Sequence, residues 1–501
     1  MSDAMQAICS DRLLRLSVIN KFPSVVVALL ILLSCSVASA AEGAEHGQAM
    51  GNLLPLVTVT PFVILLLAIA VMPLTASHWW EHNKNKGIVA AVLAVPLAIY
   101  LATQFGHDGT HRLFHTSLEY VSFIALLGSL FVISGGVYVK GSLSGTPLVN
   151  TAVLTLGAAI ASIVGTTGAS VLLIRPLLRA NNARQSKVHV VVFFIFIVSN
   201  CGGLLTPLGD PPLFLGFLRG VPFTWTFRLW GEWLLVNGAL LVIFNIWDQI
   251  VFNREERQRP GSQLEEVQKH EPLRVLGLHN VVFLAGIVGV IIGVGHLVAT
   301  QGESVSFTVM QAGAMVLLGA IAYATTAKEN RQNNNFGFGP IIEVAVLFAG
   351  IFITMIPALE ILNVKGEHLG LDRNTPWHFF WATGVLSSFL DNAPTYMTFA
   401  ATAVGIENAH LPPGADRIAL EGQFLATFLT LGPIAEKLLA AISCGAVFMG
   451  ANTYIGNGPN FMVKAIAEEN GVKMPGFFAY MAYSGCILIP LFIVVTFVFF
   501  L

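Results

Sequence analysis

One polar motif occurs twice in this 501-residue chain, in two segments that are otherwise apolar and long enough to cross a membrane. The first copy is Gly-Leu-Leu-Thr-Pro-Leu-Gly-Asp-Pro-Pro at 203–212, and the second is Gly-Ala-Asn-Thr-Tyr-Ile-Gly-Asn-Gly-Pro at 450–459. Two glycines, a threonine and a proline recur at a constant offset of 247 residues. Glycine and proline break a helix and free its backbone groups, and matching breaks in two halves of a membrane protein are typical of a transporter's binding site.

The composition is that of a membrane protein with many spans. Hydrophobic residues make up 55% of the chain and charged residues 11%, with a mean hydropathy of +0.74. Ordinary globular domains contain roughly 25% charged residues, and a soluble chain of this composition would need a larger core than single domains build. The net charge of −2 and the lack of a basic stripe with interleaved aromatic residues argue against a nucleic-acid partner.

The first 40 residues have the layout of a cleavable secretory signal. Three basic residues precede an apolar run over 25–37, which is followed by Ala-Ser-Ala at 38–40. This is the pattern of a signal peptide with its cleavage site. We therefore expect residues 1–40 to be removed, and the mature chain to be a multi-pass protein of a bacterial inner membrane that starts on the outer side. An uncleaved first membrane helix is the alternative.

The remaining chain predicts an all-α membrane protein of about 10–11 spans. Eight apolar segments are long enough to cross the membrane without interruption. Four other apolar segments have a cluster of polar residues or of glycine and proline in their middle. Irregular backbone is tolerated in a membrane only where protein or a wet cavity surrounds it, so we expect two re-entrant hairpins and two broken helices. The uninterrupted spans are 53–74, 87–104, 118–139, 230–252, 276–297, 308–326, 342–362 and 477–500; the hairpins are 147–180 and 377–403, and the broken helices are 188–217 and 436–467.

A polar linker at 253–275, with an expected interfacial helix, divides the chain into an N-terminal half, 41–252, and a C-terminal half, 276–501. Each half contains a helix, a hairpin and a broken helix in that order. With the start outside and both hairpins re-entrant, sixteen Lys and Arg residues fall on the cytoplasmic side and seven outside. This bias supports the orientation, and it makes the two halves inverted repeats.

Asp210 and Asp391 are the strongest candidates for function, because a carboxylate inside a membrane segment is costly. A sodium or lithium ion needs hard oxygen ligands, for which we nominate Asp210, Asp391 and Asn392, and both aspartates could also carry protons. Each aspartate could instead cap the half-helix that follows it, and the two roles can coexist. Further oxygen donors for the cation and proton site are Thr166, Thr167, Ser199, Asn200, Thr206, Thr395, Asn452, Thr453 and Asn457.

Other polar residues have two interpretations each. Glu343 could be a proton carrier facing the cavity or a solvated helix end at the cytoplasmic surface, whereas the interfacial reading is favoured for Glu119. The row His107, His111 and His115 would form a metal cluster or pH sensor on a helix, but three solvated histidines in an exposed loop are favoured. The three cysteines beyond the signal have no CxxC spacing, and we expect neither a disulfide nor a metal site from them.

The motifs at 199–213, 390–395 and 450–460 resemble the signatures of the ion transporter superfamily. This superfamily includes NhaD-type sodium/proton antiporters, arsenite permeases, citrate transporters and sodium/dicarboxylate symporters. The resemblance covers essentially the whole chain after the signal. It implies an inverted-repeat fold, a homodimer, and an elevator-like movement of a transport part against a scaffold.

The hairpin tips depart from one branch of this superfamily. The sodium/dicarboxylate members carry Ser-Asn-Thr at both tips, whereas this chain has Thr-Thr-Gly at 166–168 and Asp-Asn-Ala at 391–393. A carboxylate at the second tip would repel a di- or tricarboxylate. We therefore expect an NhaD-like antiporter of sodium or lithium and protons, embedded in lipid, with no bound cofactor, no enzymatic activity and no ATP-binding Walker A motif. The alternative is a citrate, dicarboxylate or arsenite transporter, with Arg175 as the anion ligand.

Overall fold

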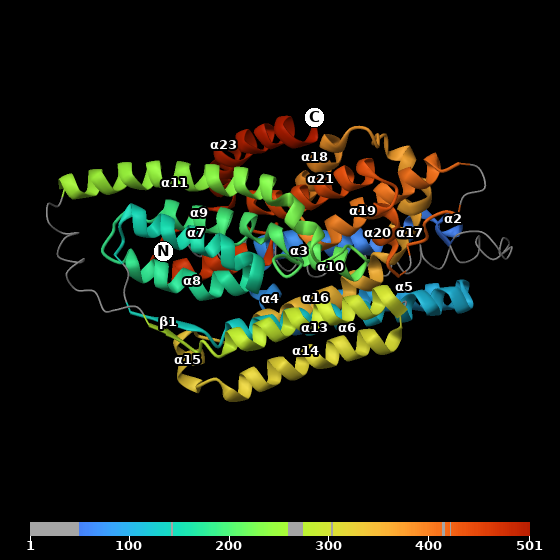
Figure 1. The fold of residues 1–501 in the computed structure, drawn as a ribbon, viewed down its shortest axis with the longest axis horizontal. Coiled ribbons are helices and arrows are strands. Elements are labelled where there is room, and N and C mark those ends of the chain that lie inside the picture. The colour runs from blue at the N-terminus through green and yellow to red at the C-terminus, as the bar shows by residue number, and fades with distance from the viewer. Residues whose placement is uncertain (1–49, 142–143, 259–273, 302–303, 413–415, 421) are drawn as a thin grey trace, which may run out of the picture. The chain divides into compact units, whose positions relative to one another are not determined.

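The computed structural model describes residues 50–141, 144–258, 274–301, 304–412, 416–420 and 422–501. Its elements are almost all helices (Figure 1), and ten are long and apolar enough to cross a membrane. The number is up to eleven if the bent pair α16 and α17, at Gly339–Thr354 and Ile356–Lys365, forms one span. The all-α polytopic prediction is thus confirmed. The expected signal at 1–40 and the expected interfacial helix in the linker lie outside the described residues.

The chain forms two compact units, and each takes residues from both sequence halves. The described part of the first unit consists of residues 50–120 and 342–364. It has a small apolar core, where Leu54, Leu97 and Leu101 pack with Ile356. Its helices are α2 (Met50–Leu53), η1 (Leu56–Val59), α3 (Thr60–Thr75), α4 (Ser77–Trp80), α5 (Asn83–Gln104), the start of α6 (Gly106–Ser134), and most of α16 and α17.

One expectation in this unit is wrong. The segment around His107 was expected to be an exposed loop before a span at 118–139, but α6 is helical from Gly106 onwards. The side chain of Thr110 donates to the carbonyl of Gly106 at 2.9 Å, a bond typical of a continuous helix. Because only Gly106 in this stretch has a positive φ, the remaining polar residues fit the first turns of the helix without strain.

The second unit, residues 121–341 and 365–501, contains the two copies of the repeated motif. Its most deeply buried spans are those that begin at Val188 and Pro433, whereas α13 and α14 expose most of their apolar surface. Before the second half its elements are β1 (Tyr138–Lys140), α7 (Pro147–Val164), α8 (Thr166–Ala180), α9 (Val188–Ile197), η2 (Cys201–Leu205), α10 (Pro211–Leu218), η3 (Trp225–Leu229) and α11 (Trp230–Gln258).

The rest of the unit follows the linker. Strand β2 (Arg274–Leu276) pairs antiparallel with β1, and α11 extends as a helix into the predicted linker as far as Gln258. The later elements are α13 (Asn280–Gln301), α14 (Val305–Thr325), α15 (Lys328–Asn333), η4 (Gly366–Leu369), α18 (Pro376–Ser387), α19 (Asn392–His410), α20 (Phe424–Leu429), α21 (Pro433–Met449), η5 (Gly450–Asn452), α22 (Gly458–Glu469), α23 (Phe477–Val495) and η6 (Thr496–Phe500).

Two helix pairs occupy the segments expected as hairpins. Helices α7 and α8 are joined at Gly165, whose φ of 84° is accessible to glycine at little cost. Helices α18 and α19 are joined by a short connection that ends at Asp391. The two helix pairs span 147–180 and 376–410, where the sequence led us to expect hairpins at 147–180 and 377–403.

The two motif copies form nearly identical breaks. In each, a helix ends, a short 3-10 segment follows, and an extended residue precedes the next helix. Asp210, before α10, has φ −145° and ψ 144°, and Asn457, before α22, has φ −147° and ψ 141°. A Cβ on Gly209 would overlap the carbonyl oxygen of Gly203, and a Cβ on Gly456 would overlap that of Gly450. The motif glycines are therefore required because the backbone passes itself closely within each break.

Candidate functional site

Asp210 lies at the centre of the two motif copies and both hairpin tips. Its Oδ1 accepts hydrogen bonds from Thr166 Oγ1 at 2.9 Å and from Asn457 Nδ2 at 3.2 Å. Its Oδ2 accepts a short hydrogen bond from Asn392 Nδ2. Only 1% of Asp210 is exposed. The three donors come from three separate parts of the chain, so the carboxylate is the point where these parts are joined.

Four half-helices begin at this carboxylate. Thr166 and Asn392 are the first residues of α8 and α19, and Asp210 and Asn457 immediately precede α10 and α22. The N-terminus of a helix carries a partial positive charge of about half a unit. The arrangement therefore favours a negative charge at its centre, and the chain itself supplies that charge through Asp210.

Asp391 caps the helix that follows it, whereas Asp210 does not. The side chain of Asp210 makes no capping hydrogen bond to α10, although it stands at the position of a cap. The side chain of Asp391 does cap its helix, because Oδ1 accepts a hydrogen bond of 3.0 Å from the backbone amide of Ala393. Thus Asp210 is directed at the hairpin tips, and Asp391 stabilises the start of α19.

Asn457 joins Asp210 to the first broken helix. Its amide nitrogen lies 3.1 Å from the carbonyl oxygen of Ser199 and 3.2 Å from Oδ1 of Asn200. Asn200 in turn donates to Asn460 at 2.7 Å. These buried amides satisfy one another, as polar groups in an apolar setting must. They hold the two breaks against each other directly beside the carboxylate.

A second set of bonds fastens each break to its hairpin. Thr206 Oγ1 donates to the carbonyl of Ser162 near the first tip, and Thr453 Oγ1 donates to the carbonyl of Ser388 near the second tip at 2.5 Å. Asn452 Nδ2 also donates to Ser388 Oγ at 2.9 Å. We call the two threonine–serine bonds the hairpin latches. Neither latch includes Asp210.

The described residues give the centre no basic counter-charge. Among the described residues no lysine, arginine or histidine forms an ion pair with Asp210 or Asp391. Two buried amide oxygens, Asn392 Oδ1 and Asn452 Oδ1, have no hydrogen-bond donor in this part of the chain. Such oxygens are costly when left unpaired, and they are the hard ligand type that an alkali cation prefers. No group of three or more His, Cys, Asp or Glu residues able to hold a metal ion occurs in the described structure.

Three nominated residues lie outside this contact network. Thr395 is buried but donates to the backbone oxygen of Asp391 at 2.9 Å, which is a bond within its own helix. Thr167 is next to the tip and has no hydrogen bond in the described structure through its side chain. Glu343 belongs to the first unit, where Oε1 lies 2.7 Å from Lys86 Nζ and 44% of its side chain is exposed. These contacts support the helix-end interpretation of Glu343.

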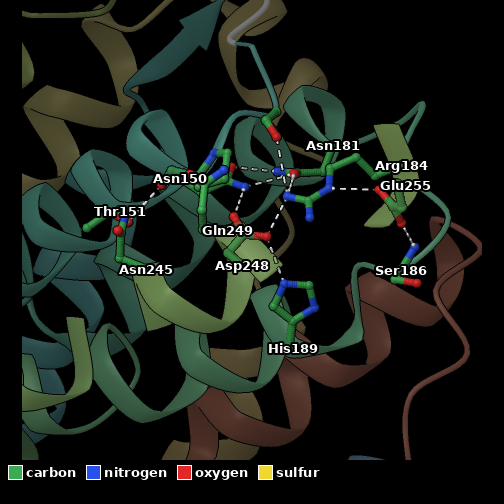
Figure 2. A network of polar contacts seen from close by, with 12 residues as sticks. Asn150, Thr151, Asn181, Arg184, Ser186, His189, Asn245, Asp248, Gln249 and Glu255 are labelled. Carbon is green, nitrogen blue, oxygen red and sulfur yellow. Dashed lines mark hydrogen bonds and ion pairs between the residues drawn. The ribbon is translucent and has the colours of Figure 1, made fainter. Parts of the chain in front are cut away.

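Sequence reasoning missed a second buried polar network, shown in Figure 2. Asp248, on α11, is fully buried, and Oδ1 lies 2.6 Å from Arg184 Nη1 and 2.8 Å from His189 Nε2. Its Oδ2 accepts a hydrogen bond of 2.9 Å from Asn150 Nδ2. The side chain of Asn150 also exchanges hydrogen bonds with Asn181. The first hairpin is therefore fastened at its base, because Asn150 lies on α7 and Asn181 directly follows α8.

Arg184 extends this network towards the surface. Its Nε lies 3.4 Å from Glu255 Oε2, and Glu255 Oε1 accepts a hydrogen bond of 2.6 Å from the backbone amide of Ser186. In the sequence, Arg184 is one of the sixteen Lys and Arg residues expected on the cytoplasmic side, and Asp248 lies near the end of the expected span 230–252. The sequence shows a carboxylate, Asp248, near the end of a span, which hints at a polar contact there. Only the fold shows that its partner is Arg184.

The fold and the site together define a membrane transport protein of the secondary type. Residues 51–500 match the model of a family described as "Putative citrate transport", and because the match spans most of the chain, the protein belongs to that family. This agrees with the superfamily resemblance. No curated protein matches the chain in a sequence comparison.

Proposed function

We propose that this protein exchanges sodium or lithium ions for protons across the membrane, with Asp210 as the group that binds both. The observation that carries the proposal is a buried carboxylate that accepts three hydrogen bonds but has no basic partner in the described structure. A buried carboxylate without a counter-ion is expensive, so it is compensated by a proton or a bound cation. Because both would occupy the same oxygens, their binding is mutually exclusive.

The electrostatics of the centre favour this cargo. Four helix N-termini attract an anion, and Asp210 occupies the place that an anionic cargo would otherwise take. The carboxylate together with the unpaired oxygens of Asn392 and Asn452 makes a set of hard ligands for a small cation. Asp391 at the neighbouring tip adds negative potential, which would raise the local concentration of cations.

The proposal is tested by transport in proteoliposomes that carry a preformed pH gradient and a pH-sensitive dye. Addition of sodium or lithium is expected to dissipate the gradient, and potassium is expected to act weakly or not at all. Citrate and arsenite are added in separate experiments. If the gradient is stable with sodium and lithium, but citrate enters the vesicles, the antiporter proposal is wrong.

A citrate or related anion transporter is the second candidate, because the matching family is described by citrate transport. Arg175, on α8, is partly exposed and is a basic residue of the first hairpin that could meet an anion. This candidate predicts uptake of radiolabelled citrate that depends on Arg175. An Arg175→Gln variant would abolish this uptake, whereas it would leave sodium/proton exchange largely intact under the first proposal.

The assembly and location follow from the same resemblance. The spans place the protein in a lipid bilayer. We propose that it is a homodimer in a bacterial inner membrane and that its transport part moves as an elevator.

A further inference from the structure

Three histidines form a row along the first turns of α6. His107, His111 and His115 are spaced four residues apart, and since α6 is helical from Gly106, they lie on neighbouring turns of one face. The ring centroids of His107 and His111 are 6.0 Å apart, and those of His111 and His115 are 4.4 Å apart. The row precedes the apolar part of the helix and belongs to the first unit, whereas Asp210 belongs to the second.

The surroundings leave the rings accessible. His107 and His111 are exposed, and His115 is half-buried. The neighbouring cation, Arg112, is directed to the buried face, where Nη2 lies 2.7 Å from Glu360 Oε1 and only 6% of its side chain is exposed. The positive charge of Arg112 is therefore neutralised by Glu360 and does not oppose a metal ion at the histidines.

The geometry points to a binding site for one divalent cation of the Zn²⁺, Ni²⁺ or Cu²⁺ class, with His111 and His115 as its two protein ligands. Two histidines four residues apart on a helix are the spacing with which helical motifs hold zinc. Imidazole selects these cations over Na⁺, Mg²⁺ and Ca²⁺. The rings of His111 and His115 are already close, whereas the His107 ring lies further along the row.

The remaining coordination positions are filled by water. The described residues contain no group of three or more potential ligands close enough to enclose a metal ion. Structural zinc sites have four protein ligands, so a site with two is exchangeable and binds more weakly. Its occupancy depends on the free concentration of metal outside the protein and requires no change in the fold.

The test is equilibrium binding of Zn²⁺ to the full chain, purified in detergent through a tag without histidine. Two ligands held together bind roughly a hundredfold or more tightly than either alone. His111→Ala and His115→Ala are therefore each expected to weaken zinc binding by roughly a hundredfold. His107→Ala is expected to change the affinity by less than a few fold. Because His115 is half-buried, His115→Gln is measured as well, with helix content by circular dichroism.

A second histidine pair provides the matched control. His78 and His82 are also four residues apart, with ring centroids 5.9 Å from each other, but α4 ends at Trp80 between them. His78→Ala is expected to leave zinc affinity unchanged. Unchanged zinc affinity in a folded His111→Ala, His115→Ala double variant would overturn the proposal, and so would a loss of zinc binding in His78→Ala.

Discussion

Asp210 and Asn457 occupy the same position in the two copies of the repeated motif, and Asn457 Nδ2 donates a hydrogen bond of 3.2 Å to Asp210 Oδ1. The two residues have nearly the same backbone conformation. Thr166 and Asn392 are the first residues of α8 and α19, and both donate to this carboxylate. The two motif copies are thus alike in backbone at this position, but only the first copy has a carboxylate there.

Replacement of Asp210 separates transport from folding. Asp210→Asn removes the charge and keeps the size of the side chain, so sodium-dependent dissipation of the pH gradient is expected to fall below detection. Yield and the elution profile in size-exclusion chromatography are expected to stay normal. Asp391→Asn is the matched variant, and because Asn caps a helix about as well as Asp, exchange is expected to persist with a weaker apparent sodium affinity. Equal activity of the two variants would contradict the assignment.

The two threonines at the first tip provide a test of the hydrogen bond to Asp210. Thr166→Val removes a donor to a buried carboxylate, and a hydrogen bond to a charged group contributes about 1.5–3 kcal/mol. We expect exchange to fall roughly tenfold or more, since about 1.4 kcal/mol corresponds to one factor of ten. Thr167→Val alters the neighbouring residue without removing a described bond and is expected to retain activity. The rates are compared at saturating sodium.

A second carboxylate at the symmetric position should change the pH dependence. In Asn457→Asp, two carboxylates would share the site, and like charges so close favour a shared proton. Sodium then displaces the proton only at lower proton concentration, so the optimum of exchange is expected to move to more alkaline pH. Asn457→Ala removes a donor without adding a charge and is expected to shift the optimum less, in the same direction. A shift of the Asn457→Asp optimum to acidic pH would rule out this mechanism.

The Asp248 network is expected to govern stability. Removal of one partner from a buried ion pair costs about 3–5 kcal/mol, so Asp248→Ala should lower the unfolding temperature in detergent substantially. Arg228 and Glu436 form the matched exposed pair, with 63% and 41% of their side chains exposed. Arg228→Ala should change stability little, because exposed pairs contribute about 0–1 kcal/mol. Similar melting temperatures for both variants would show that the buried network is dispensable.

Much of the centre was predictable because its constraint is local. Gly209 lies against the backbone of Gly203, and Gly456 against that of Gly450, so closely that a side chain would not fit. A ten-residue motif is enough to reveal this requirement. The offset of 247 residues also pairs Asp210 with Asn457. The sequence allows two roles for Asp391, a helix cap or a ligand that faces across the site. Only the structure shows that its side chain caps α19.

The rest depends on contacts between distant residues. Asn150 and Asp248 are 98 residues apart, and each alone resembles a polar residue at a membrane surface. The expectation of a loop at the start of α6 was wrong for a local reason. Gly106, Asp108 and Gly109 are residue types that are common in turns, but the helix begins at Gly106. In the fold Gly109 faces the carbonyl of Leu101 so closely that a larger residue would collide with it. That glycine is a packing requirement within a helical segment.

The hairpin latches are separate from the hydrogen bonds to the carboxylate of Asp210. The bonds from Thr206 to Ser162 and from Thr453 to Ser388 involve no atom of Asp210. If Asp210 exchanges a proton for a cation, as we propose, neither latch has to break when the load changes. The breaks and the hairpins would then keep one shape with either load bound.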